Sequence, residues 1–219
     1  MNNSLLTINR IKALLDTNIW LSTVTHDLLL VPKTVKWGEI FVTADVATEQ
    51  PRKLRNKTQE KSDAIYDALK AIAVMSKEGR VILYRSNETQ FEEMHLRRPS
   101  LRGTELDAFS GIDVEFVHGP LRRDFTITAH SSREELKGEW YEFLGNIRHP
   151  RFLELRTAIP AKKHTADLYH IWTAEHNSLD CYITLDQKFV NAVALPKPIE
   201  TSVIVCTPTE FLKWAASRP

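Results

Sequence analysis

Four carboxylates stand where they could share a metal ion. Asp16 and Asp186 each follow a short apolar run, while Glu49 and Asp167 lie near the expected starts of helices. In an open parallel sheet, ligands bind outside the carboxyl ends of the strands, so we expect these four side chains in one cleft. Each alone could be an ordinary turn or cap residue. Together they would repel one another unless a cation neutralised them, and the pattern therefore predicts a divalent metal site.

The predicted ligands are all oxygen atoms, and the chain has no Cys or His pair at zinc spacing. Oxygen donors favour Mg²⁺ or Mn²⁺. Asn18 and Thr184 are expected to support the site by orienting a carboxylate from behind. His164 and His170 flank Asp167 at helical spacings of three, which suits a phosphate contact or a general acid, although most histidines in this setting are core or surface residues.

The elements that must position these residues follow from the hydrophobic pattern. A proline at position 51 after Thr48 indicates a helix start, which would put Glu49 at a strand-to-helix junction. Strands alternating with helices predict a parallel sheet with helices on both faces, a three-layer α/β/α sandwich. The expected strands are residues 11–15, 37–43, 81–84, 181–185 and 202–206, and the expected helices are residues 58–77, 165–176 and 210–216.

The pattern changes between about residues 99 and 150, where glycines break the chain into short pieces. Residues 114–118 and 125–129 alternate as the two strands of a hairpin would, with a turn at Gly119-Pro120. A capping box of Ser131 or Ser132 with Glu134 or Glu135 then opens a helix. We therefore expect a single domain over residues 1–219 with a hairpin-plus-helix segment inserted at about 99–150.

Composition limits the classes of function. A net charge of +1 argues against a protein that coats nucleic acid by bulk electrostatics, so any such contact must use local patches. No apolar run reaches the roughly 18 to 20 residues that span a bilayer, and the first ten residues lack a signal-peptide core. We expect a cytoplasmic protein without membrane contact. The candidate basic patches are Arg52, Lys53, Arg55 and Lys57, and Arg97, Arg98 and Arg102.

Four segments resemble the signature segments of PIN-domain nucleases, the family that includes the VapC-like ribonucleases. They are Ala-Leu-Leu-Asp-Thr-Asn at 13–18, Phe-Val-Thr-Ala-Asp-Val-Ala-Thr-Glu at 41–49, Ala-Asp-Leu-Tyr-His-Ile at 166–171, and Tyr-Ile-Thr-Leu-Asp-Gln-Lys-Phe at 182–189. Residues 203–212 resemble the last strand and helix of that fold. The resemblance covers residues 11–95 and 155–215. The match at Glu49 is looser, and Asp45 or Glu39 could take its role.

The resemblance implies an endoribonuclease that hydrolyses RNA phosphodiester bonds with Mg²⁺ or Mn²⁺. Its metal would be held by Asp16, Glu49, Asp167 and Asp186, with Asn18 and Thr184 in support. The implied role is the toxin of a toxin–antitoxin pair, with an antitoxin protein or a second copy of the chain as partner. The alternatives are an RNA-processing or defence nuclease and a non-catalytic binding protein of the same fold. A phosphatase is disfavoured because Asn18 stands where its second Asp is needed.

Overall fold

A five-stranded parallel sheet forms the centre of the molecule, with strand order β5-β4-β1-β6-β7. The computed structural model describes residues 10–38, 40–54, 56–95, 106–123, 132–194 and 199–218. Because neighbouring strands run in one direction, their carboxyl ends share one edge of the sheet. The strands are β1 (Ile11–Leu15), β4 (Val81–Ser86), β5 (Val114–Val117), β6 (Cys181–Ile183) and β7 (Ile204–Cys206).

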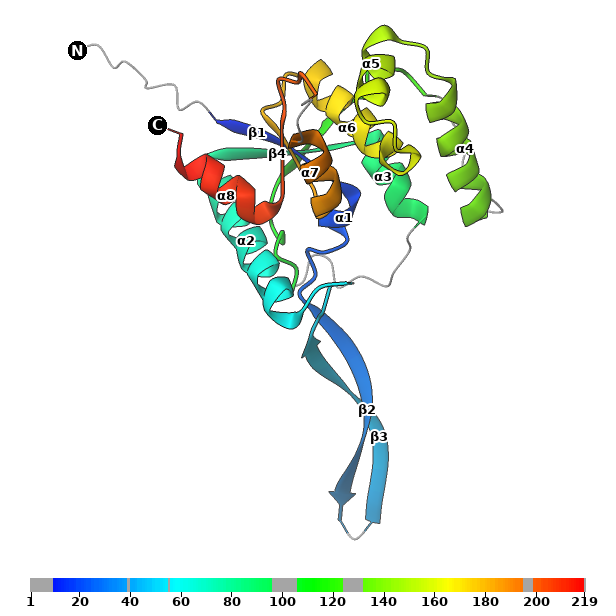
Figure 1. Cartoon of the computed structure of the whole chain (residues 1–219). Coiled ribbons are helices and arrows are strands. Elements are labelled where there is room, and N and C mark those ends of the chain that lie inside the picture. The colour runs from blue at the N-terminus through cyan, green and yellow to red at the C-terminus, as the bar shows by residue number, and fades with distance from the viewer. Residues whose placement is uncertain are drawn as a thin grey trace, which may run out of the picture.

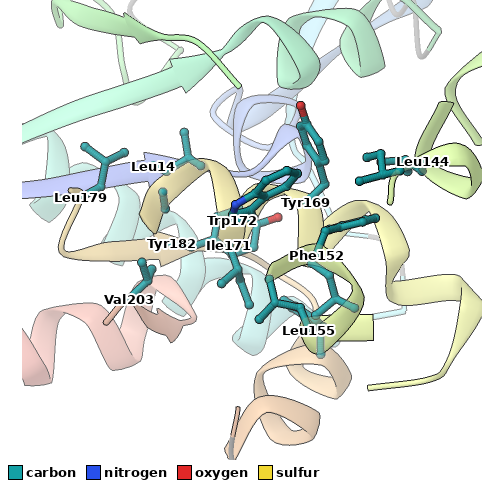
Figure 2. Close-up of a cluster of buried hydrophobic side chains, with 14 of the residues drawn as sticks. Leu14, Leu144, Phe152, Leu155, Tyr169, Ile171, Trp172, Leu179, Tyr182 and Val203 are labelled. Atoms are coloured by element: carbon teal, nitrogen blue, oxygen red, sulfur yellow. The ribbon is translucent and has the colours of Figure 1, made fainter. Parts of the chain in front are cut away.

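Helices flank this sheet, and two buried clusters lie on its opposite faces. Side chains alternate along a strand, so Leu14 of β1 packs into one cluster while Ala13 and Leu15 pack into the other. The cluster around Leu14 draws on α4, α5 and α6 (Figure 2). The arrangement is compatible with a three-layer sandwich. The helices are α1 (Thr17–Trp20), α2 (Gln59–Lys77), α3 (Asn87–His95), α4 (Arg133–Asn146), α5 (Pro150–Ala158), the 3-10 turn Lys162–His164, α6 (Thr165–His176), α7 (Gln187–Ala194) and α8 (Pro208–Ala216).

Local signals explain why several expected elements form where they do. Thr58 caps α2 by accepting a hydrogen bond from the Lys61 N–H, and Gly79 follows the helix with a φ of 71°. Thr207 and Glu210 form a capping box at the start of α8. Both cysteines, Cys181 and Cys206, are buried and free, as their apolar strands predicted.

A long two-stranded hairpin projects from this body (Figure 1). It pairs β2 (His26–Trp37) with β3 (Ile40–Pro51) in antiparallel register, from His26 opposite Pro51 to Trp37 opposite Ile40. Most of the expected strand at 37–43 is extended, but it lies in this hairpin and not in the central sheet, and the helix start expected at 48–51 is wrong because β3 continues to Pro51. The run of Ile, Val and Thr residues in β3 favours an extended strand throughout, and Gly38, with a φ of 62°, supplies the left-handed conformation needed near the turn.

The segment expected as an insertion contributes to the core. Residues 114–117 form β5, which pairs in parallel with β4 at the edge of the central sheet. Ser132 and Glu135 form the expected capping box, and α4 buries Leu136, Trp140 and Leu144. Trp140 is thus a core residue, 3% exposed. The second strand of the expected hairpin, residues 125–129, lies outside the described residues.

Among the described residues, none of the helices is both long and apolar enough to cross a bilayer.

Candidate metal centre

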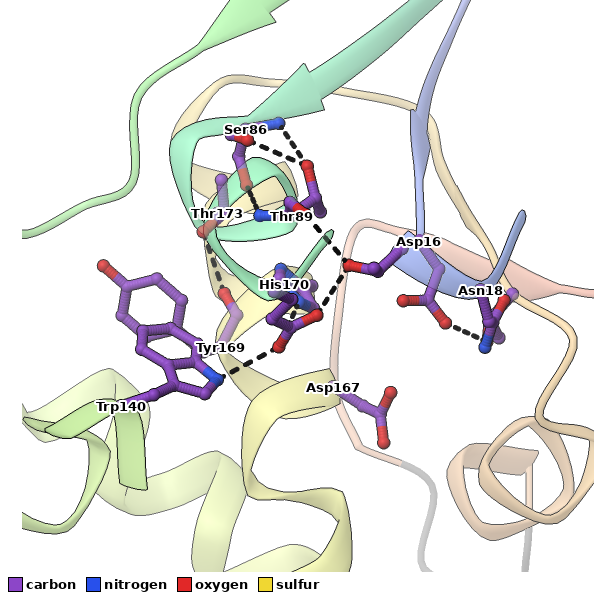
Figure 3. A network of polar contacts seen from close by, with 12 residues as sticks. Asp16, Asn18, Ser86, Thr89, Trp140, Asp167, Tyr169, His170 and Thr173 are labelled. Carbon is purple, nitrogen blue, oxygen red and sulfur yellow. Dashed lines mark hydrogen bonds and ion pairs between the residues drawn. The ribbon is translucent and has the colours of Figure 1, made fainter. Parts of the chain in front are cut away.

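Acidic and imidazole side chains gather at the carboxyl edge of the three central strands. Asp16 directly follows β1, and Asp186 follows β6 after two residues. Glu92 lies on α3, the helix that begins where β4 ends. Asp167 and His170 lie on α6, as Figure 3 shows. The strand order places β4, β1 and β6 side by side, so the segments that follow them meet in space.

The first group consists of Asp16, Glu92 and His170, whose ligand atoms lie within 4.8 Å of one another. His170 Nε2 is 3.4 Å from Glu92 Oε1. Glu92 is held on both oxygens, by the Thr17 hydroxyl at 2.6 Å and by the Trp140 indole N–H at 3.0 Å. Asp16 follows β1, Glu92 lies on α3 and His170 lies on α6, and the group could hold a metal ion.

The second group consists of His164, Asp167 and Asp186, with ligand atoms again within 4.8 Å of one another. His164 Nδ1 is 3.3 Å from Asp167 Oδ2 and 3.9 Å from Asp186 Oδ2. Asp186 Oδ1 accepts the N–H groups of Lys188 and Phe189 at the start of α7. One oxygen of Asp186 is therefore anchored by the helix, and the other lies toward His164.

A chain of hydrogen bonds through Thr184 and Asn18 holds the carboxylate of Asp16 in place. The Thr184 hydroxyl donates to Asp16 Oδ2 at 2.5 Å. Because this uses its only proton, the Thr184 oxygen accepts from Asn18 Nδ2 at 3.1 Å and from the Asp186 N–H at 3.1 Å. Asn18 Oδ1 in turn accepts the Leu185 N–H at 2.9 Å. Asn18 and Thr184 thus connect the end of β1 to the end of β6.

Burial and crowding of charge perturb these groups. Burial, with the charge of Asp16 as the next cause, raises the pKa of Asp167 well above its usual value. Burial also raises the pKa of Asp16, although His170 partly offsets this. Burial would lower the pKa of His170, but the adjacent Glu92 outweighs it and raises that pKa to about 9. Burial opposes ionisation of Glu92, yet His170 and the Thr17 and Trp140 hydrogen bonds leave its pKa lowered.

The structure brings together Asp16, Asp167 and Asp186 as expected, but not Glu49. Glu49 lies on β3 of the projecting hairpin, opposite Leu28, and its side chain is exposed. Asp45 lies on the same strand, and Glu39 lies outside the described residues. The expectation that Glu49 follows a strand of the central sheet was wrong because the hairpin carries this segment away from the sheet.

Sequence reasoning missed Glu92, which completes the first group. A usable signal was present. β4 runs straight into α3, where Ser86 and Thr89 exchange hydrogen bonds between hydroxyl and backbone N–H at 3.0 and 3.2 Å. Glu92 is three residues beyond Thr89, on the same face of the helix. Because ligands bind outside the carboxyl ends of parallel strands, the helix that follows β4 was also a place to expect a site acid.

The predicted basic patches are only partly described. Arg52 forms an ion pair with Asp27 at 3.6 Å and donates to the Leu21 carbonyl at 3.2 Å, so it joins the hairpin to the body. Arg55 and the patch Arg97, Arg98 and Arg102 lie outside the described residues.

In comparisons with known proteins, no protein-family model matches the chain, and no curated protein is significantly similar to it.

Proposed function

We propose that the chain is a metal-dependent endoribonuclease with a PIN-like fold. The observation that carries the proposal is the convergence of Asp16, Glu92, Asp167 and Asp186 on the carboxyl edge of a parallel sheet. Burying several carboxylates together is costly, and a site that accepts this cost is typical of metal binding and catalysis. The resemblance of residues 13–18 and 182–189 to PIN-domain signatures supports RNA as the substrate.

The side chains present fit a divalent cation. Asp16 is 5% exposed, and the first group combines two carboxylates with a buried imidazole whose Nε2 faces Glu92 at 3.4 Å and whose Nδ1 has no hydrogen-bond partner among the described residues. When bound, the cation supplies Lewis-acid polarisation of the scissile phosphodiester and neutralises the charge that develops during in-line displacement.

The contribution of the chain itself is preorganisation. Thr184 holds Asp16, Thr17 and Trp140 hold Glu92, and the first N–H groups of α7 hold Asp186. Carboxylates fixed in this way need little rearrangement when they meet a cation and a phosphate.

The test is cleavage of single-stranded and structured RNA by the purified protein with added Mg²⁺, Mn²⁺ or Co²⁺, and its loss on chelation. Asp16→Asn and Asp186→Asn should each abolish cleavage while the protein stays folded. Asp45→Asn is the matched control, because it makes the same change on the exposed hairpin and should cleave like the wild type.

Cleavage that survives both site substitutions would refute the proposed site. RNA binding without cleavage under every metal condition would favour the non-catalytic alternative over an enzyme.

A further inference from the structure

Each of the two groups at the site contains one histidine among its possible ligands, His170 in the first and His164 in the second. We propose that both imidazoles are metal ligands and that the site therefore takes a first-row transition ion in preference to Mg²⁺. This inference rests on the proposed function, since it names the metal of the same site.

The surroundings of His170 are the first argument. The residue is 1% exposed, its Nδ1 has no hydrogen-bond partner in the part of the chain that the structure describes, and its Nε2 has only the 3.4 Å ion-pair contact with Glu92 Oε1. A buried polar nitrogen without a partner is costly, so a histidine that served only for packing would be a poor choice here. Its neighbours Tyr169 and Ile171 are fully buried core residues. The ring nitrogen that faces Glu92 is placed as a metal ligand would be.

His164 gives the second argument. It is 3% exposed, and its Nδ1 lies between Asp167 and Asp186, at 3.3 and 3.9 Å from their oxygens. The ring packs against Phe189 with centroids 5.1 Å apart, and the ring of His170 packs against Tyr182 at 5.8 Å. Aromatic neighbours thus fix the direction of both imidazoles.

The choice of ion follows from ligand chemistry. Mg²⁺ favours oxygen ligands and keeps several of its waters, whereas imidazole is a good ligand for Fe²⁺, Co²⁺, Ni²⁺ and Zn²⁺. A set of two carboxylates and one imidazole therefore suits the transition ions better than it suits Mg²⁺. The sequence pattern pointed to oxygen ligands alone because the two histidines lie on a turn and a helix whose phase only the structure shows.

A different role for His170 would be a fixed internal cation that balances Asp16 and Glu92 without touching a metal. The two roles predict opposite effects of substitution. Replacing a ligand with glutamine weakens binding of the ion that used it. Replacing a fixed cation removes repulsion and strengthens binding of every divalent cation, Mg²⁺ included.

The experiment measures Co²⁺ and Mg²⁺ affinities by calorimetry, without RNA, for the wild type, His170→Gln and His164→Gln. We expect each variant to weaken Co²⁺ binding at least about tenfold more than Mg²⁺ binding. His176→Gln is the matched control, since His176 lies exposed in the last turn of the same helix as His170 and should change neither affinity. Equal changes for the two ions, or tighter binding of both, would overturn the inference for the residue concerned.

A second measurement does not depend on a variant that folds. Pulsed electron paramagnetic resonance of Mn²⁺ bound to the wild type should show coupling to a histidine nitrogen, and the coupling should change on labelling the histidines with ¹⁵N. Bound Mn²⁺ without nitrogen coupling would overturn the metal assignment even if the protein cleaves RNA. Nitrogen coupling in a protein that cleaves no RNA would instead refute the nuclease and leave the metal assignment standing.

Discussion

The hairpin of β2 and β3 lies outside the core, and the segment from β5 to α4 lies within it, which is the reverse of what their sequences suggested. Residues 37–49 were expected to supply a core strand and a site acid, yet they belong to a projecting, exposed hairpin that covers residues 26–51. Residues 114–146 were expected to be an accessory, yet they supply an edge strand and a core helix. The comparison shows that alternation of apolar residues predicts a strand without saying whether the strand is covered.

Packing partners make the difference between the two regions. On the hairpin, Phe41 is 72% exposed and Ile40 is 64% exposed. On α4, Leu136, Trp140 and Leu144 follow a spacing of four residues and meet Tyr169 and Phe91 across the core. Four-residue spacing on a helix creates one continuous apolar face that must be buried.

The largest difference in stability between the two regions is expected when each is deleted. Removing residues 114–146 takes away β5 and α4, and we expect loss of cooperative folding, because net stabilities are only about 5–15 kcal/mol. Replacing residues 28–49 with an Asn-Gly turn keeps the pairs nearest the body and should change the free energy of unfolding by less than ~1 kcal/mol. Urea denaturation followed by circular dichroism measures both. A cooperatively folded 114–146 deletion would contradict our description of the core.

Truncation of one apolar side chain in each region should show the same difference in stability, with a smaller effect. Leu144→Ala leaves a cavity at a fully buried position and should cost about 2–5 kcal/mol. Phe41→Ala truncates a side chain that is larger than leucine but exposed to solvent, and it should change the free energy of unfolding by less than ~0.5 kcal/mol. Similar losses for the two variants would show that the hairpin is covered in solution.

Substitution of Glu92 and of Glu49 compares the two regions by their effect on RNA cleavage. Glu92→Gln should lower RNA cleavage by ~100-fold, or about 2.7 kcal/mol in the barrier, because it weakens the first metal group. Glu49→Gln makes the same change on β3 and should leave the rate unaltered. Single-turnover kinetics at saturating metal compares them. A rate loss confined to Glu49→Gln would restore the acid suggested by the sequence.

The smallest expected effect concerns pH. The raised pKa of Asp167 means that the folded protein binds this proton more tightly than the unfolded chain does. Stability is therefore lost as pH rises from the ordinary Asp value, about 3.9, toward the folded pKa. In metal-free protein, Asp167→Asn should raise Tm at neutral pH by about 2–4 °C, or ~1 kcal/mol, and the gain should vanish in acid.

Asp45→Asn on the hairpin is the control for this titration and should not raise Tm at either pH. Thermal melts in the presence of a chelator provide the data. A Tm of Asp167→Asn below that of the wild type at neutral pH would mean that the carboxylates do not oppose folding.

Elements with strong local signals could be predicted from the sequence. β1 and α6 form over the residues that the apolar pattern predicted, and α8 begins at Pro208, two residues before the expected start, after a capping box of Thr207 and Glu210. The hairpin could not be placed, because β-branched residues satisfy a buried and an exposed strand equally well. Only the absence of a covering helix distinguishes them, and that depends on residues far away in the chain.

The site was predictable to the extent that its residues follow strands. Asp16 directly follows β1 and Asp186 follows β6 after two residues, so the topology alone brings them together. Glu92 lies inside a helix that also carries Glu88 and Glu93, and only the helix phase selects which acid faces Asp16. The same holds for His170, whose partners Glu92 and Asp16 lie on α3 and directly after β1.

The length of the hairpin has a hydrodynamic consequence. Strands of 12 residues span about 40 Å, whereas a globular chain of 219 residues has a radius of gyration of about 17 Å. The molecule should therefore tumble anisotropically and elute from a sizing column ahead of compact proteins of equal mass. Shortening the hairpin should therefore speed diffusion by more than the lost mass alone would.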